Sequence, residues 1–262
     1  MSAQSWIARL LKFDRDGDTF RIREPRRASV KRLFGGLIAA QSLVAAGATV
    51  APGKLPQSLH TYFVRGGLYD AEVEFQVERT RDGRSFDTRR VTAIQHDAVI
   101  LEMIASFHLP EPGADWYPDI LTKLEFDAAA PKESMLDFGE CFELRTIPGD
   151  ESEFAIPPFW ARSRLPIEDD PLIQAATLTF LSDLGPVPAA LPPGVPLRRD
   201  LGFAASLDHA IWFHRPFHPD RWHRYEVRSV NHNDSRGLAV GSLYAADGTL
   251  IASTTQEALW RM

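Results

Sequence analysis

Asp183 is a carboxylate at a position where secondary structure disfavours one. Residues 171–182 carry no charge, and Asp183 follows them directly. If these residues form a helix, a negative charge at its C-terminal end opposes the helix dipole, and a residue placed against local preference indicates a functional role. The alternative is that Asp183 only begins the proline-rich turn that follows, which is an equally common place for aspartate.

Gln256 is the second candidate for chemistry. It lies in a polar run, residues 253–257, between two alanines. Strand alternation would place Thr254 and Gln256 on one face, and Ser253 and Thr255 on the other. Five consecutive polar residues are difficult to pack against a core, so the alternative is an exposed edge strand.

Ser206 stands close to Asp208 and His209, which suggests a Ser–His–Asp triad. The spacing argues against a triad, because alternation places Ser206 and Asp208 on one face of a strand and His209 on the other. The chain also lacks the G-x-S-x-G nucleophile elbow, so we do not expect an α/β-hydrolase. His209, like His60, is expected to be structural.

Gly35 and Gly36 stand near the start of an uncharged stretch that we expect to be helical. Backbone N–H groups at a helix start point outwards and attract a carbonyl oxygen or a developing oxyanion. Tight packing of the helix start is the alternative role for these glycines. Basic side chains just before the helix could meet phosphates, or could form a solvated charged run; they are Arg26, Arg27, Lys31 and Arg32.

Metal and cofactor sites are not expected. Five of the eight histidines lie between His209 and His232, but no H-E-x-x-H motif is present. His209 and His214 would face opposite sides of a strand. Cys141 is the single cysteine, which excludes an internal disulfide and a four-cysteine zinc site.

Two uncharged helices must position these groups. The first is predicted over residues 33–49, within an uncharged stretch that reaches Gly53 and is long enough to span a bilayer. Its glycines, small alanines and polar Gln41 favour a helix buried in a protein core over a membrane span. The second is predicted over residues 171–182, because Asp170 and Pro171 form a good N-terminal signature.

Runs rich in Val, Ile, Phe, Tyr and Thr follow each helix and predict antiparallel meanders. After the first helix they cover residues 59–65, 71–80, 84–96 and 98–108. After the second they cover residues 205–215, 225–229, 238–245 and 249–259, and Asp247-Gly248 is the strongest hairpin turn. Shorter strands are predicted over residues 19–22, 141–147 and 159–164, and a turn over 14–18.

The two halves share this order of elements, and some identities recur at an offset of 150 residues. Phe63 matches Phe213 and Arg65 matches Arg215, and the apolar pair Ile100-Leu101 falls on the apolar pair Leu250-Ile251. We therefore predict a duplication, with an N-terminal half over 1–110, a linker over 111–138 and a C-terminal half over 139–262; two unrelated α+β halves are the alternative. The predicted fold is α+β, a tandem hotdog in which antiparallel strands of one continuous curved sheet wrap two long central helices.

Composition limits the class of protein. The chain has 262 residues, of which 44% are hydrophobic and 24% charged, with a net charge of −6. These values are typical of a globular protein and give no basic footprint for nucleic acid. The N-terminal residues show no secretory signal, so we expect a cytoplasmic protein.

Three long segments of the chain resemble the acyl-CoA thioesterase II family, the double-hotdog thioesterases of bacteria and peroxisomes. The first is LFGGLIAAQ at 33–41. The second combines SLHTYFVR at 58–65 with ERTRDGRSFDTRRVTAIQ at 78–95. The third combines SLDHAIWFHRPF at 206–217 with DGTLIASTTQE at 247–257, and FLSD at 180–183 adds to it.

The resemblance implies an enzyme that hydrolyses acyl-CoA thioesters to a free fatty acid and CoA without a cofactor. The family's catalytic Asp, Ser or Thr, and Gln fall on Asp183, Ser206 and Gln256, and Gly35 and Gly36 would hold the thioester oxygen. The family often has Tyr-x-Ser before the Asp, where this chain has Phe-Leu-Ser, and Gly185-Pro186 follow closely, which bears on substrate range.

Two readings compete with this enzyme: a hotdog hydratase or dehydratase, and a non-catalytic acyl-CoA-binding or interaction protein. The first needs an Asp/His pair at a helix start, which is not visible near Phe34 or Leu172. Intact Asp183, Ser206 and Gln256 argue against an acyl-CoA-binding protein, and only the motif match argues against an interaction protein. The expected partners are acyl-CoA and further copies of the chain, as a dimer of double hotdogs or higher oligomer, with no nucleic acid and no membrane span.

Overall fold

The computed structural model describes residues 7, 10–24, 32–118, 129–132, 141–146, 155–195, 197 and 202–261. The chain divides into two compact units, which we describe separately. Unit 1 comprises Met1–Pro112, Ile167–Leu181 and Ala210–Trp212, and unit 2 comprises Gly113–Pro166, Ser182–His209 and Phe213–Met262.

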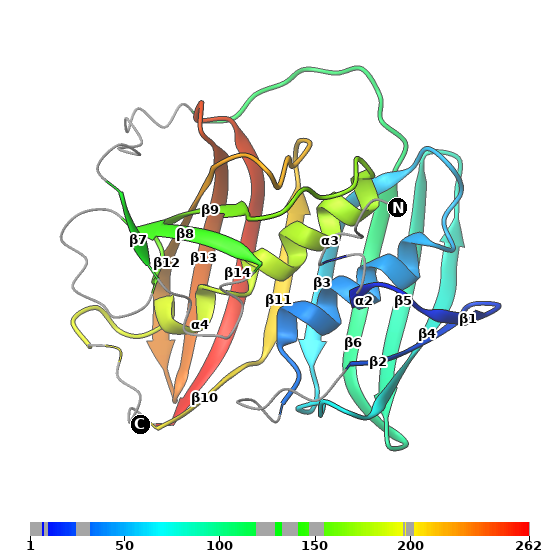
Figure 1. Ribbon diagram of the computed structural model, residues 1–262, viewed down its shortest axis with the longest axis horizontal. Helices are drawn as coiled ribbons and strands as arrows, with labels where there is room; N and C mark the ends of the chain where they lie inside the picture. Colours follow the sequence, from blue (N-terminus) through cyan, green and yellow to red (C-terminus); the bar gives the residue numbers. More distant parts are fainter. Residues whose placement is uncertain are drawn as a thin grey trace. The chain divides into compact units, whose positions relative to one another are not determined.

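Unit 1 contains an antiparallel sheet (Figure 1). Its strands pair in the order β1-β2-β4-β5-β6-β3. Their bounds are β1 (Asp14–Asp16), β2 (Thr19–Arg23), β3 (Leu55–Phe63), β4 (Glu72–Asp82), β5 (Phe86–Gln95) and β6 (Ala98–His108). The predicted meander is confirmed, and Asp14–Asp16 adds a short strand where the sequence predicted only a turn.

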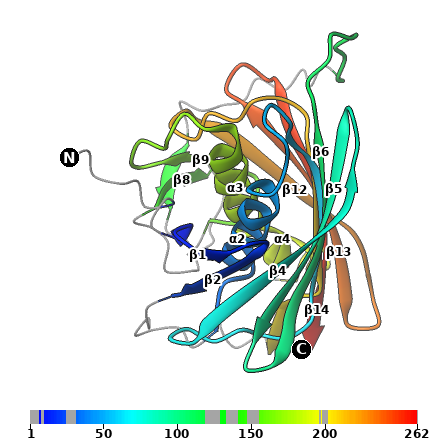
Figure 2. The ribbon, with the colours of Figure 1, turned by 90° about the vertical axis from the view of Figure 1, so that its right-hand side faces the viewer.

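Helix α2 (Gly35–Gly47) packs against β3, β4, β5 and β6, and Figure 2 shows it on one face of these strands. Its residues are buried from Gly36 to Ala46, which explains why no position carries a charge. Gln41 is fully buried, and its Nε2 donates to the carbonyl of Leu10 and to Glu24. The stretch is therefore a core helix, as predicted, and among the described residues no helix is long and apolar enough to cross a membrane.

Helix α3 runs over Pro171–Ser182, with the bounds expected from the sequence. The Asp170 carboxylate accepts hydrogen bonds from the N–H groups of Leu172 and Ile173, at 2.8 and 3.3 Å, so it caps the helix. In unit 1 its residues pack against α2: Leu172 lies against Gly47, and the Phe180 and Phe34 rings meet edge to face. The two helices therefore run antiparallel.

Unit 2 contains strands in the order β14-β13-β12-β9-β8-β7, and β10 also pairs with β14. Their bounds are β7 (Ala130–Lys132), β8 (Phe142–Thr146), β9 (Phe159–Ser163), β10 (Phe203–Ser206), β12 (His223–Asn233), β13 (Arg236–Ala245) and β14 (Leu250–Arg261). The proline-rich segment, expected to be a loop, contains a short helix, α4 (Pro186–Ala189), that packs on β12, β13 and β14.

The strand predicted over residues 205–215 is interrupted at Leu207. It forms β10 and a separate strand β11 (Asp208–Phe213), whose residues belong partly to each unit. The N–H of Leu207 donates to the carbonyl of Glu257 at 2.9 Å, so the chain remains close to β14 at the break. No glycine or proline marks this interruption in the sequence.

Corresponding strand ends in the two halves make the same hydrogen bonds. The N–H of Arg65 donates to the carbonyl of Ile100 at 3.2 Å, and the N–H of Arg215 donates to Ile251 at 3.2 Å. Ile100 thus corresponds to Ile251, not to Leu250 as the constant offset of 150 predicted. One extra residue before this point in the second half explains the shift.

Candidate functional site

Asp183 lies directly after the last residue of α3 and is 6% exposed. Its Oδ1 accepts hydrogen bonds from Gln256 Nε2 at 2.8 Å and from Ser206 Oγ at 3.4 Å. All three residues belong to unit 2, and they come from the end of a helix and from two paired strands, β10 and β14. The structure therefore brings together the three side chains that the sequence singled out.

Gln256 connects the other two polar groups. Its Nε2 also donates to Ser206 Oγ at 2.8 Å, so both amide protons are used within the site. The residue is 1% exposed, and its Oε1 has no hydrogen-bond partner among the described residues. A buried acceptor of this kind can take a hydrogen bond from a small polar molecule such as water.

Strand β14 positions Gln256 by alternation. Thr254 and Gln256 are each 1% exposed, while Ser253 and Thr255 are partly exposed, so the two pairs occupy opposite faces, as alternation predicted. The alternative of an exposed edge strand is wrong, because β14 pairs with β13 on one side and with β10 as well.

Ser206 ends β10, immediately before the break at Leu207. On the far side of the break, His209 Nε2 lies 2.8 Å from the Oγ of Ser182, the residue before Asp183. Ser206 and His209 thus both reach the end of α3, and the expectation that they face opposite ways is wrong, because the break interrupts the alternation. The Asp208 carboxylate accepts the N–H of Glu257 at 2.7 Å.

Tyr225, on β12, is a residue that the sequence did not single out. Its hydroxyl donates to the backbone carbonyl of Ser182 at 2.9 Å and lies 2.8 Å from Thr254 Oγ1. Burial raises the pKa of this phenol, and the nearby negative charge of Asp183 raises it further, so Tyr225 remains neutral. Alternation with buried His223 is the sequence signal that would have placed it inward.

The arrangement suits proton transfer. A buried carboxylate can accept a proton, and the amide and hydroxyl beside it can hold the group that gives the proton. Among the described residues, no cluster of three or more His, Cys, Asp or Glu side chains has the geometry to hold a metal ion.

The predicted glycine site lies in unit 1. Helix α2 begins at Gly35, after Phe34, and no side chain caps it. A Cβ on Gly36 would lie 2.8 Å from the carbonyl oxygen of Phe180 and 2.6 Å from the Phe34 ring, so close packing alone requires glycine there. Arg32 pairs with Leu68 through an isolated backbone bridge. Three of the basic residues expected to meet phosphates lie outside the described residues; they are Arg26, Arg27 and Lys31.

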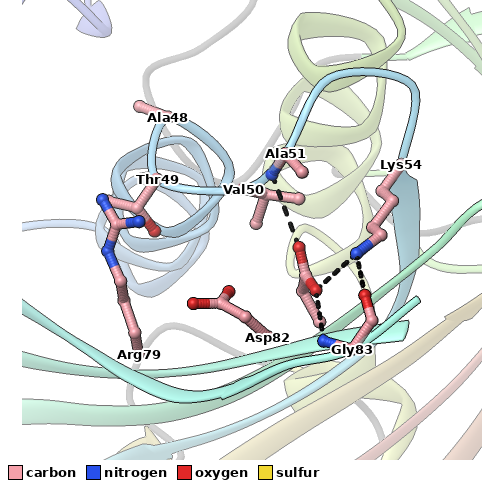
Figure 3. Close-up of a pocket in the computed structure, with 9 residues that line it drawn as sticks. Ala48, Thr49, Val50, Ala51, Lys54, Arg79, Asp82 and Gly83 are labelled. Carbon is pink, nitrogen blue, oxygen red and sulfur yellow. Dashed lines mark hydrogen bonds and ion pairs between the residues drawn. The ribbon is translucent and has the colours of Figure 1, made fainter. Parts of the chain in front are cut away.

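A separate pocket of about 430 Å³ lies in unit 1 at the C-terminal end of α2 (Figure 3). Lys54 Nζ donates to Asp87 at 2.5 Å and to the carbonyl of Gly83 at 2.6 Å. Asp87 also accepts the N–H groups of Gly83 and Ala51, at 3.0 and 3.4 Å. Since these groups pair with one another, the cluster fixes the chain after α2 to the β4–β5 turn.

The chain matches two families along its length. Residues 24–108 match the family described as acyl-CoA thioesterase N-terminal domain, and residues 105–260 match the acyl-CoA thioesterase C-terminal domain. The chain is 34% identical to human acyl-coenzyme A thioesterase 8, over 94% of this chain and 86% of that protein.

The chain is also similar to solved structures of this family and of the hotdog fold. An acyl-CoA thioesterase II, TesB2, from Mycobacterium marinum is 34% identical and superposes with a TM-score of 0.80, covering 97% of this chain and 96% of that one. A protein with a hot dog fold from Alicyclobacillus acidocaldarius has a TM-score of 0.78 at 16% identity, covering 99% of each chain. The hotdog class predicted from the sequence is therefore confirmed. This chain belongs to the acyl-CoA thioesterase family, and it is a thioesterase.

Proposed function

We propose that the protein hydrolyses acyl-CoA thioesters to a free fatty acid and CoA, using water activated by Asp183 with Ser206 and Gln256. The observation that carries this proposal is the single amide nitrogen of Gln256, which bonds both the buried carboxylate and the hydroxyl. Family membership supports the reaction class, and this geometry supports the assignment of residues.

A thioester needs no covalent enzyme intermediate, because its carbonyl is already activated. Asp183 takes a proton from a bound water as the water oxygen attacks the thioester carbon. Gln256 Oε1 and Ser206 orient that water, which accounts for the buried amide oxygen. The tetrahedral intermediate then collapses, the carbon–sulfur bond breaks, and the CoA thiolate leaves and takes up the proton.

The N–H groups at Gly35 and Gly36 are proposed donors to the thioester oxygen. The first N–H groups of a helix have no acceptor within the helix, and the helix dipole adds positive potential there. Alanine at Gly36 would keep the N–H but clash with Phe180, so the glycine itself has a packing role as well.

We infer that the two halves are tandem hotdogs with the domain bounds 1–110, 111–138 and 139–262. The matching bonds at Arg65 and Arg215 support a common origin. We propose, in addition, that the strands of both halves form one continuous sheet. We also propose that the protein assembles as a dimer of double hotdogs or a higher oligomer, and that it is cytoplasmic.

Release of free CoA thiol from a chain-length series of acyl-CoA substrates tests the activity and its range. Asp183→Asn keeps the shape of the side chain but removes the base, and we expect it to lower kcat by about 10²–10⁴-fold, the range ascribed to general-base catalysis. Asp169→Asn is the matched control, because Asp169 lies at the other end of α3 and is exposed. Full turnover by Asp183→Asn would overturn the assignment.

A further inference from the structure

Ser182, the last residue of α3, is held from two directions. Its backbone carbonyl accepts the hydroxyl proton of Tyr225 at 2.9 Å, and its own hydroxyl lies 2.8 Å from His209 Nε2. All three residues are buried, Tyr225 and His209 completely. The last carbonyls of a helix have no N–H donor within the helix, so the Tyr225 phenol donates to a group that the helix leaves unsatisfied.

The direction of the Tyr225 hydroxyl is itself fixed. A phenol has one proton, and it is given to Ser182, so Thr254 must donate its own proton to the phenol oxygen across 2.8 Å. Thr254 and Gln256 lie on the same face of β14. One strand therefore carries both the second anchor of Tyr225 and the amide that bonds Asp183.

Strand β13 has a glycine, with no side chain, where it passes the Tyr225 phenol. Gly241 faces Thr254 in the β13–β14 register. A Cβ at Gly241 would lie 2.8 and 2.9 Å from Cε2 and the hydroxyl oxygen of Tyr225, which is closer than packing allows. The Phe159 ring meets the Tyr225 ring edge to face, with centroids 5.8 Å apart. The phenol is thus confined on several sides.

We propose that Tyr225 is a positioning residue for hydrolysis: by holding the Ser182 carbonyl, it keeps the Asp183 carboxylate in reach of Gln256 and Ser206. This role rests on the proposed function of Asp183. The bond from Ser206 to Asp183 is already long, at 3.4 Å, so a small movement of the helix end breaks it.

Tyr225→Phe removes the hydroxyl and keeps the ring. Since a misplacement of about 1 Å can cost on the order of 10²-fold in rate, we expect kcat to fall by roughly 10–100-fold, with KM changed less than about twofold. Tyr244→Phe is the matched control, because Tyr244 is a buried tyrosine of unit 2 outside this cluster; its kcat is expected to equal that of the wild type.

Combining Tyr225→Phe with Asp183→Asn distinguishes a positioning role from general structural damage. If Tyr225 acts through Asp183, Tyr225→Phe will lower the residual rate of an Asp183→Asn enzyme by less than about twofold, because effects of groups that act as a unit are not additive. A full further loss in that background would overturn the positioning role. Should Tyr225→Phe fail to fold, Thr254→Val is the second variant: it removes the donor to the phenol oxygen and keeps the bond to Ser182. It must lower kcat, by less than loss of the Ser182 bond would, with KM changed less than about twofold, and an unchanged kcat would overturn the positioning role.

The outcomes distinguish the two proposals. Full kcat in Tyr225→Phe, together with an inactive Asp183→Asn, overturns the positioning role and leaves the proposed function intact. Full kcat in Asp183→Asn overturns the proposed function and this role with it. A fall in kcat for Tyr225→Phe that disappears in the Asp183→Asn background supports both.

Discussion

Lys54→Met removes one partner of the buried ion pair that ties the chain after α2 to the β4–β5 turn. The Lys54 and Asp87 side chains are 7% and 1% exposed, and their charged atoms lie 2.5 Å apart. Methionine fills the same space but leaves the carboxylate without its nearest positive charge. Breaking a buried pair in this way costs about 3–5 kcal/mol, and we expect the lower end, about 3 kcal/mol, because Gly83 and Ala51 still donate to Asp87.

The stability that Lys54→Met loses is expected to become smaller as the pH falls. Burial alone would raise the pKa of Asp87, but the hydrogen bonds from Lys54, Gly83 and Ala51 outweigh it and hold the pKa below its ordinary value of 3.8. A carboxylate with a lowered folded-state pKa stabilises the protein above its unfolded pKa, and this stability is lost as pH falls through the folded pKa. Without Lys54 the pKa of Asp87 rises, so in the folded variant Asp87 is protonated at a higher pH than in the wild type. The difference in unfolding free energy between the variant and the wild type therefore becomes smaller as the pH falls.

Thermal unfolding at pH 7 and at pH 4 measures both effects. For a chain of this size we expect a Tm about 6–12 °C below that of the wild type at pH 7, and a smaller difference at pH 4. Arg79→Met is the control: it breaks the Arg79–Asp18 pair, whose side chains are 46% and 33% exposed, and because solvent screens this pair the variant should lower Tm much less than Lys54→Met does. An unchanged Tm for Lys54→Met, or a deficit equal at the two pH values, would refute the reasoning.

Two further substitutions test the site and the helix start. Gln256→Ala removes the donor shared by Asp183 and Ser206, and we expect thiol release to show kcat lowered by about 10²-fold, less than for Asp183→Asn; unchanged kcat would contradict the role of the amide. Gly36→Ala places a Cβ against Phe180 and should cost about 1–3 kcal/mol in chemical unfolding, and a variant as stable as the wild type would contradict the packing argument.

The sequence predicted α3 to the residue because its signals are local. Asp170 and Pro171 act within one helical turn, and Asp183 ends an uncharged run that can be read directly. That Thr254 and Gln256 share one face of β14 followed equally well from alternation, because a period of two needs no knowledge of distant neighbours. Which face is buried did not follow, because it depends on the strands that pair with β14.

The features that the sequence missed depend on contacts between distant segments. The break at Leu207 carries no glycine or proline, and it is supported by a hydrogen bond to Glu257, fifty residues later. Tyr225 lies on β12 and donates to Ser182 at the end of α3, 43 residues earlier in the chain, so no local sequence pattern marks its role. Helix α4 contains two prolines, a composition more typical of a loop, and the N–H of the Trp260 indole donates to its Val187 carbonyl.

The burial of α2 also has a consequence for how the chain is made. The strands that cover this helix, β3 to β6, end at His108, about 60 residues after the helix leaves the ribosome, and α3, which packs along it, is complete only near residue 182. At roughly 5–20 residues per second, an uncharged helix remains without its final cover for on the order of 10 s during synthesis. We therefore expect that substitutions that slow pairing of β3–β6 will lower the yield of folded protein before they change the activity of molecules that have folded.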